Sequence, residues 1–120
     1  MNRQEVINWV GEQYGVQPDF PWRDWNAVLR HGDNNKWFGV IMEVGRDKLG
    51  LDGDGTIHVM NVKCDPALIG FLRNQPGFLP AYHMNKEQWL SIRLDGSAPE
   101  EQVKNLIDQS FELTRVKKKR

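Results

Sequence analysis

The stretch TIHVMNVKCDPALIGFL, residues 56–72, changes its hydrophobic period halfway and so predicts two different elements in direct succession. Its first half alternates as a strand with two distinct faces does. One face would carry Ile57, Val59 and Asn61, and the other His58, Met60 and Val62. Asp65 then supplies a helix N-cap and Pro66 the first helical position, before an apolar stripe of Leu68, Ile69 and Leu72. A strand that leads straight into a helix indicates a domain of mixed α and β structure.

The chain before this stretch predicts a helix and two more strands. Asn2 and Glu5 have the spacing of a capping box at a helix start. The apolar face of that helix would be formed by Val6, Ile7, Val10 and Tyr14. Two β-rich runs follow, WNAVLRH at 25–31 and KWFGVIMEV at 36–44. The GDNN between them favours a hairpin turn, because Gly, Asp and Asn tolerate positive φ.

The remaining chain completes one antiparallel sheet. A glycine-rich stretch at 45–55 separates the second and third predicted strands, and WLSIRL at 89–94 alternates again. Ser97 and Glu100 have capping-box spacing before the last helix. Its buried side would carry Val103, Leu106, Ile107, Ser110, Phe111 and Thr114. The order helix, three strands, helix, one or two strands, helix predicts an α+β two-layer sandwich with helices on one face of the sheet.

Composition limits the class of protein. With 39% apolar and 27% charged residues, the 120-residue chain is predicted to form one globular domain over residues 1–116. The final KKKR, residues 117–120, is predicted to be a disordered basic tail. Without it, 12 Lys and Arg stand against 16 Asp and Glu, a formal charge of −4, whereas nucleic-acid binders usually carry a basic excess.

The expected location is the cytoplasm. No apolar run reaches the ~20 residues that cross a bilayer, so no membrane association is predicted. The N-terminus lacks the pattern of a signal peptide. Cys64 is the only cysteine, so an internal disulfide is impossible and a reducing compartment is the simpler assumption. We expect a monomer.

Motifs for catalysis and metal binding are absent from the sequence. His31, His58 and His83 are too far apart for a local metal motif, and DGDG at 52–55 lacks the Gly and Glu that a calcium loop requires. Cys64 precedes a predicted helix start, which favours a thiolate, but it also ends an apolar strand, where buried cysteines are common. We therefore expect no metal, no cofactor and no enzymatic activity.

The stretch PAYHMNKEQW, residues 80–89, is too polar for a core and too aromatic for an ordinary loop. In a structural interpretation, Asn85 and Gln88 cap a turn that opens the following strand. In a functional interpretation, His83, Asn85 and Lys86 face a ligand or a phosphate. The residues alone leave both interpretations open.

Residues 76–114, PGFLPAYHMNKEQWLSIRLDGSAPEEQVKNLIDQSFELT, resemble the MmcQ/YjbR family of small bacterial proteins. The resemblance is strongest in the block from Tyr82 to Trp89. Upstream, VKCDPAL at 62–68, PDFPW at 18–22 and KWFGVI at 36–41 also correspond to family segments, so nearly the whole chain is covered. The resemblance implies the order α-β(3)-α-β(2)-α and a CyaY-like, double-wing fold, in which two β-hairpin loops project and contact DNA.

The resemblance places the wings at two loops. The first wing, residues 30–37, would offer Arg30, His31, Asn34, Asn35 and Lys36 to phosphates and base edges. The second wing, residues 46–55, would offer Arg46 and Lys48, although three Asp residues outnumber them. His83, Asn85 and Lys86 complete the predicted nucleic-acid-binding set.

Two classes of function follow. The leading hypothesis is a non-enzymatic binding module whose wing cations, together with the KKKR tail, contact DNA. The alternative is a protein-partner adaptor or chaperone-like module with no nucleic-acid role. A near-neutral body is better suited to a protein interface than to a DNA duplex. A contiguous Lys/Arg stripe would favour DNA, and an exposed apolar patch would favour the adaptor.

Overall fold

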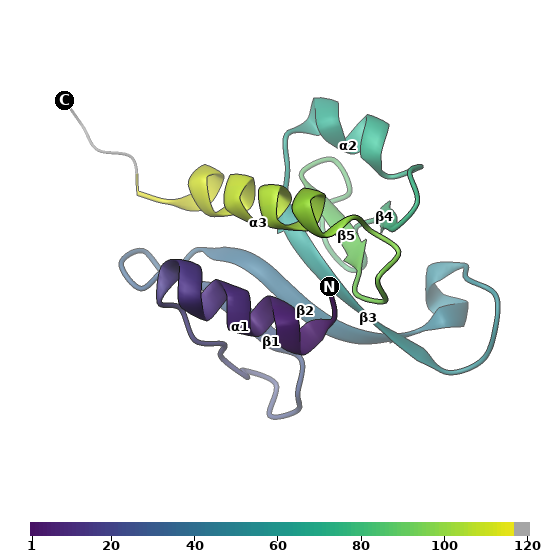
Figure 1. The fold of residues 1–120 in the computed structure, drawn as a ribbon, viewed down its shortest axis with the longest axis horizontal. Helices are drawn as coiled ribbons and strands as arrows, with labels where there is room; N and C mark the ends of the chain where they lie inside the picture. The colour runs from purple at the N-terminus through teal and green to yellow at the C-terminus, as the bar shows by residue number, and fades with distance from the viewer. Residues whose placement is uncertain (117–120) are drawn as a thin grey trace.

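The computed structural model describes residues 1–116 and confirms the predicted α+β sandwich, with the helices and strands in the order α-β(3)-α-β(2)-α (Figure 1). The elements are α1 (Arg3–Tyr14), β1 (Ala27–Arg30), β2 (Trp37–Gly45), β3 (Thr56–Lys63), α2 (Pro66–Leu72), β4 (Phe78–Pro80), β5 (Trp89–Arg93) and α3 (Glu100–Thr114). A short 3-10 helix, η1 (Arg46–Leu49), follows β2 directly. The predicted basic tail, residues 117–120, lies outside the described residues.

The five strands form one antiparallel sheet in the order β1-β2-β3-β5-β4. The pairing of β1 with β2 shifts between Leu29 and Arg30, so one extra residue of β2 bulges there. In a regular strand, Phe38 and Ile41 would point to opposite faces, because they are three positions apart. The bulge brings both side chains to the same face, where they join the core. Asp19 adds a backbone bridge to Val28 at the outer edge of β1.

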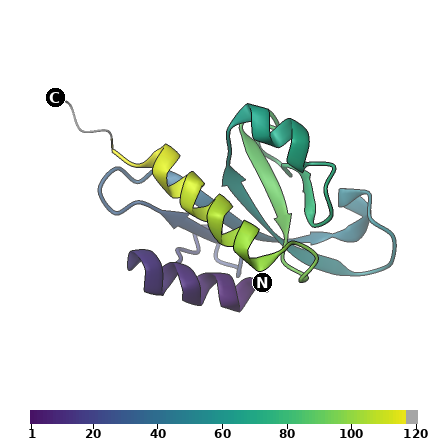
Figure 2. The same ribbon diagram turned by 45° about the horizontal axis from the view of Figure 1, so that its top comes forward.

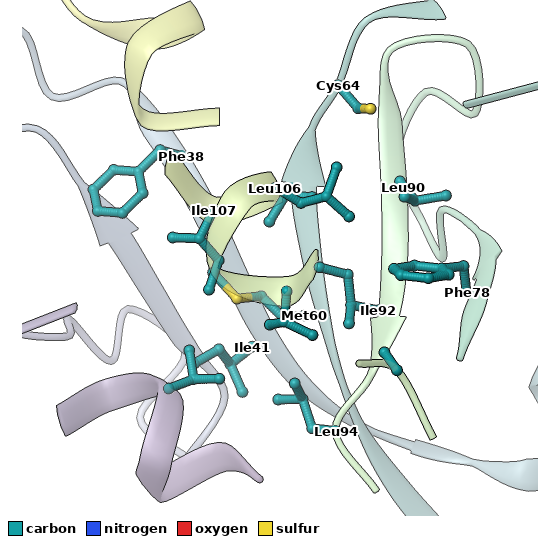
Figure 3. Close-up of a cluster of buried hydrophobic side chains, with 14 of the residues drawn as sticks. Phe38, Ile41, Met60, Cys64, Phe78, Leu90, Ile92, Leu94, Leu106 and Ile107 are labelled. Carbon is teal, nitrogen blue, oxygen red and sulfur yellow. The ribbon is translucent and has the colours of Figure 1, made fainter. Parts of the chain in front are cut away.

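The hydrophobic core lies between the sheet and the helices. Figures 2 and 3 show α3 crossing the sheet, with Leu106 and Ile107 directed at Ile41, Met60 and Ile92. Helix α1 lies beside α3, where Tyr14 stacks on Phe111 with ring centroids 4.1 Å apart. The Tyr14 hydroxyl donates to Asp108 Oδ1 at 2.8 Å. These contacts form the two-layer arrangement that the apolar stripes predicted.

Two of the three predicted helix starts are confirmed. Asn2 and Glu5 form a reciprocal capping box, and the Asp65 side chain accepts from Ala67 N. The predicted capping box of Ser97 and Glu100 is wrong, because α3 begins at Glu100 with Pro99 as its N-cap. The Ser97 hydroxyl instead donates to Asp95, which fixes the turn before the helix.

The apolar stripe predicted for α2 is only partly buried. Ile69 and Leu72 join the core, but Leu68 is 38% exposed, because the short helix packs only a narrow face against the rest of the domain, including β4. Cys64 is buried, and burial raises the pKa of its thiol. This favours the structural interpretation of Cys64 over that of a reactive thiolate.

None of the helices in the described part of the chain is both long and apolar enough to span a bilayer. Within residues 1–116, His, Cys, Asp and Glu side chains also form no group of three that could hold a metal ion.

Candidate functional site

The first wing is attached to the C-terminal end of α3. His31 is buried, and its Nε2 lies 2.8 Å from Thr114 Oγ1. Because Thr114 Oγ1 itself donates to Ser110 O, it accepts from His31, so the Nε2 nitrogen carries the proton. Asn34 Nδ2 donates to Thr114 O at 3.0 Å. These two predicted DNA-contacting side chains therefore hold the hairpin in place.

Three further predicted residues belong to this wing. Arg30 Nε donates to Asp19 Oδ2 at 2.6 Å, an ion pair that fixes the orientation of its guanidinium. Asn35 and Lys36 remain exposed, and Asn35 adopts a φ of +59°. Asn35 and Lys36 are thus the two exposed side chains of the predicted set in this wing.

The second wing begins with η1. Its 3-10 turn leaves Lys48 exposed and Arg46 half-buried. Asp47, Asp52 and Asp54 are also exposed, so most of this wing is acidic as the sequence indicated. Any attraction for a phosphate must come from the end that carries Lys48.

The two wings lie at opposite ends of β2, because one precedes this strand and the other follows it (Figure 1). The strand has nine residues, which span roughly 30 Å at the usual strand rise. The wings therefore cannot bind the same phosphate, and a single ligand that touches both must extend along the length of β2.

The stretch at 80–89 forms a turn that is fixed in the structure. Asn85 Oδ1 accepts from Glu87 N at 2.8 Å, and the backbone of Trp89 donates to Asn85 O at 2.9 Å. The capped turn of the structural interpretation is confirmed, but Glu87 rather than Gln88 is the partner of the Asn85 side chain. His83 adopts a φ of +57° beside the Tyr82 ring, and both His83 and Lys86 are exposed.

This turn and the second wing meet. Lys48, Tyr82, His83 and Lys86 line an open hollow of about 350 Å³ beside Leu79 and Pro80 of β4. We call this the basic hollow. It brings together three of the predicted binding residues from two distant segments, whereas the other predicted residues are not part of its lining.

A second cluster was not predicted from the sequence. It lies where the N-terminus of α1 meets the ends of β2 and β3, on the helix-covered face of the sheet, and its members are Arg3, Trp25, Glu43 and His58. Trp25 Nε1 donates to Glu43 Oε1 at 3.2 Å, and the Arg3 guanidinium lies 4.8 Å from the centre of the Trp25 ring. His58 Nε2 lies 3.9 Å from Glu43 Oε2.

The electrostatics of this cluster are coupled. Hydrogen bonds from Thr56 and Trp25 lower the pKa of Glu43, and His58 and Arg3 add to the effect. Burial lowers the pKa of His58, against the opposing influence of Glu43. Glu43 and His58 are direct neighbours across β2 and β3. The sequence does not reveal this pairing, because it depends on the register of the two strands.

A third surface lies between α2 and α3. Leu68 and Leu113 line a groove of about 400 Å³ and are 38% and 48% exposed. Asp65, Asp108 and Glu112 surround them. The groove thus combines two apolar and three acidic side chains.

The fold and these sites define a small α+β domain with candidate sites on both faces of its sheet. The YjbR family model matches residues 12–113. The chain therefore belongs to the YjbR family.

Relatives of this family differ in how much of the chain they share. The protein YyaQ of Bacillus subtilis is 48% identical over 117 residues, covering 96% of this chain and 99% of its own. YjbR of Escherichia coli K12 is 37% identical over 54 residues, which cover 44% of this chain and 46% of its own.

Solved structures are similar over almost the full length. The crystal structure of a Pseudomonas syringae protein is 43% identical with a TM-score of 0.92, covering 96% of this chain and all of its own. A Deinococcus radiodurans protein has a TM-score of 0.70 at 22% identity, covering 93% of this chain and 77% of its own. The second likeness concerns the fold alone.

Proposed function

We propose that the protein is a non-enzymatic, cytoplasmic binding module that contacts DNA phosphates through the basic hollow. The observation that carries this proposal is the convergence of Lys48, His83 and Lys86 on one open hollow from the second wing and the 80–89 turn. Two exposed ammonium groups beside an imidazole suit a phosphate oxygen, and they contact the backbone without reading its sequence.

The charge distribution limits the strength of this interaction. The body carries a formal charge of −4 before the tail, so most of the surface repels a duplex. Few phosphates can be neutralised at once, and binding should be weak at physiological salt. Lys36 on the first wing lies at the far end of β2 and would contact a separate phosphate.

The test is fluorescence anisotropy with a labelled duplex of about 20 base pairs, titrated at low and near-physiological salt. A Lys48→Ala/Lys86→Ala variant should bind at least ~10-fold more weakly at low salt, and its salt slope should be shallower by roughly one for each phosphate that it no longer neutralises. The matched control is Arg73→Ala/Lys104→Ala, which removes one cation just after α2 and one from α3 and should bind as the parent protein does.

A chain ending at Val116 separates the hollow from the tail. Binding that survives this truncation supports the folded site. Binding that disappears with the tail, or that is the same in both double variants, would contradict the proposal.

The protein-adaptor alternative is favoured by the groove between α2 and α3. Its exposed Leu68 and Leu113, together with three carboxylates in the same lining, suit a segment that is both apolar and basic. The test is the titration of a synthetic amphipathic Leu/Lys peptide into ¹⁵N-labelled protein. Shifts confined to α2 and α3, and absent in a Leu68→Glu/Leu113→Glu variant, would support this function over DNA binding.

A further inference from the structure

The cluster at the N-terminus of α1 borders a cavity of about 570 Å³, which we call the Arg3 cavity. Its polar lining includes Arg3 and His58, and its apolar lining includes Ile7, Phe20 and Trp25. A cavity of this size, mostly apolar with a few convergent polar groups, has the character of a site for a small molecule. Phe20 and Trp25 remain 46% and 49% exposed, so two aromatic side chains are available at its mouth.

Arg3 and His58 are the ionisable side chains that line this cavity. Arg3 is only partly buried, so its guanidinium is available to a molecule that binds there.

Arg3 determines the charge of a matching ligand. Its guanidinium can only donate hydrogen bonds, and it keeps its positive charge. A matching ligand therefore presents an anionic acceptor to Arg3.

The surrounding contacts hold these groups in place. Glu43 is fixed by Trp25 Nε1, by Thr56 Oγ1 at 2.9 Å and, through its backbone N–H, by Asn26 Oδ1 at 2.9 Å. The Trp25 ring contacts both the Arg3 guanidinium and the His58 ring, whose centroid is 4.6 Å away. Such preorganisation reduces the entropy that a ligand would lose in ordering the site.

The first turn of α1 adds donors. Its capping box satisfies Asn2 N and Glu5 N, whereas Arg3 N and Gln4 N have no acceptor within the helix. Asn2, Arg3 and Gln4 all border the cavity, so the positive end of the helix lies at its rim.

We propose that the Arg3 cavity binds a small organic carboxylate with a flat aromatic body. The carboxylate binds the Arg3 guanidinium, and the aromatic body packs against Phe20 and Ile7. This site is independent of the basic hollow, because His58 shares the helix-covered face of β3 with Met60, whereas the turn that carries Lys86 is fastened to Asn61 on the opposite face.

The experiment is a ¹H–¹⁵N NMR titration of the ¹⁵N-labelled full chain at pH 7 with indole-3-acetate, indole-3-acetamide and acetate. Indole-3-acetate should bind saturably with a Kd of about 1 mM, as expected for a ligand of this size. The indole N–H resonance of Trp25 and the amides of the first turn of α1 should shift. The uncharged amide should bind ~10-fold more weakly, and acetate, which lacks the aromatic body, should not saturate at 10-fold higher concentration than indole-3-acetate.

Two variants separate the parts of the site. Arg3→Gln should abolish the preference for indole-3-acetate over indole-3-acetamide, because it removes the charge but keeps a donor. Phe20→Ser should weaken both ligands by a similar factor and leave their ratio unchanged. Arg115→Gln, which removes an exposed cation at the end of α3, is the matched control for charge and should change neither.

The proposal is overturned if no ligand gives saturable shifts at the Arg3 cavity, or if the shifts are scattered over the surface. It is also overturned if Arg3→Gln, with an otherwise native spectrum, retains the full preference for the carboxylate. Each of these results leaves the proposed DNA contact at the basic hollow unaffected.

Discussion

At the scale of single residues, a buried polar network determines where the 80–89 turn lies. Asn61 and Ser91 are completely buried on the face of the sheet opposite the helices. The Ser91 hydroxyl donates to Asn61 Oδ1 and accepts from Tyr82 N at 3.0 Å, and Asn61 Nδ2 donates to Tyr82 O at 2.9 Å. The network therefore fastens the turn that carries His83 and Lys86 to two central strands.

A Ser91→Ala variant tests this network. Removing the hydroxyl leaves Asn61 Oδ1 and Tyr82 N buried without their partner, which should cost about 1–3 kcal/mol in the free energy of unfolding. Urea unfolding followed by tryptophan fluorescence measures the change. The exposed Ser97→Ala is the control and should lose less, about 0.5 kcal/mol. Equal stability of Ser91→Ala and the parent protein would contradict the role of the network.

At the scale of elements, two turns are packed backbone against backbone. Gly77, just before β4, has a φ of +92°, and a Cβ atom there would lie 2.5 Å from Ala98 N, just before α3. Gly96 has a similar φ of +86°, but a Cβ atom there would meet no heavy atom within 4 Å. The close approach at Gly77 holds the edge of the sheet against the start of α3.

The pair of variants Gly77→Ala and Gly96→Ala separates backbone strain from steric clash. Both place a side chain in the left-handed region, at a cost of roughly 1–2 kcal/mol. Gly77→Ala should cost a further ~1–3 kcal/mol because the backbone of residue 98 must move. Thermal or urea unfolding of both variants gives the difference, and equal losses would mean that the turns are not held in contact.

At the scale of the whole molecule, ionisable groups between α1, α3 and the sheet determine how stability varies with pH. Burial lowers the pKa of His58 below its ordinary value of about 6.5, and Arg3 acts in the same direction while Glu43 opposes both. Burial and the hydrogen bond to Asp108 raise the pKa of Tyr14, to which the charges of Asp108 and Glu112 also contribute.

The free energy of unfolding should consequently fall on both sides of a plateau. Below about pH 6.5 the unfolded chain binds a proton at His58 before the folded chain does, so stability present above that pH is lost as the pH falls. Above about pH 10 the unfolded chain releases the Tyr14 proton first, so stability is lost as the pH rises.

Thermal unfolding from pH 4 to pH 11 measures this profile. His58→Gln should flatten the profile just below pH 6.5, and Tyr14→Phe should flatten it above pH 10. His83→Gln, at an exposed histidine, is the control and should leave the acid side unchanged. An acid side that is the same in His58→Gln and the parent protein would show that His58 does not contribute.

The sequence by itself determined the elements and the layer that they form. The alternation in residues 56–62 and 89–94, the capping box of Asn2 and Glu5, and the N-cap Asp65 are local signals, since each depends on neighbours within one turn or one strand. The start of α3 was missed because the Ser97 side chain bonds within its own turn, to Asp95, instead of capping the helix.

Only the tertiary structure decided which side chains meet. His31 and Asn34 look like ligands in the sequence, but the position of α3 puts Thr114 against both. Lys48 joins His83 and Lys86, and Arg3 joins Glu43 and His58, because strand register and loop packing bring distant segments together. Local periodicity carries no information about such long-range pairings, which is why the sequence predicted the sandwich and not the Arg3 cavity.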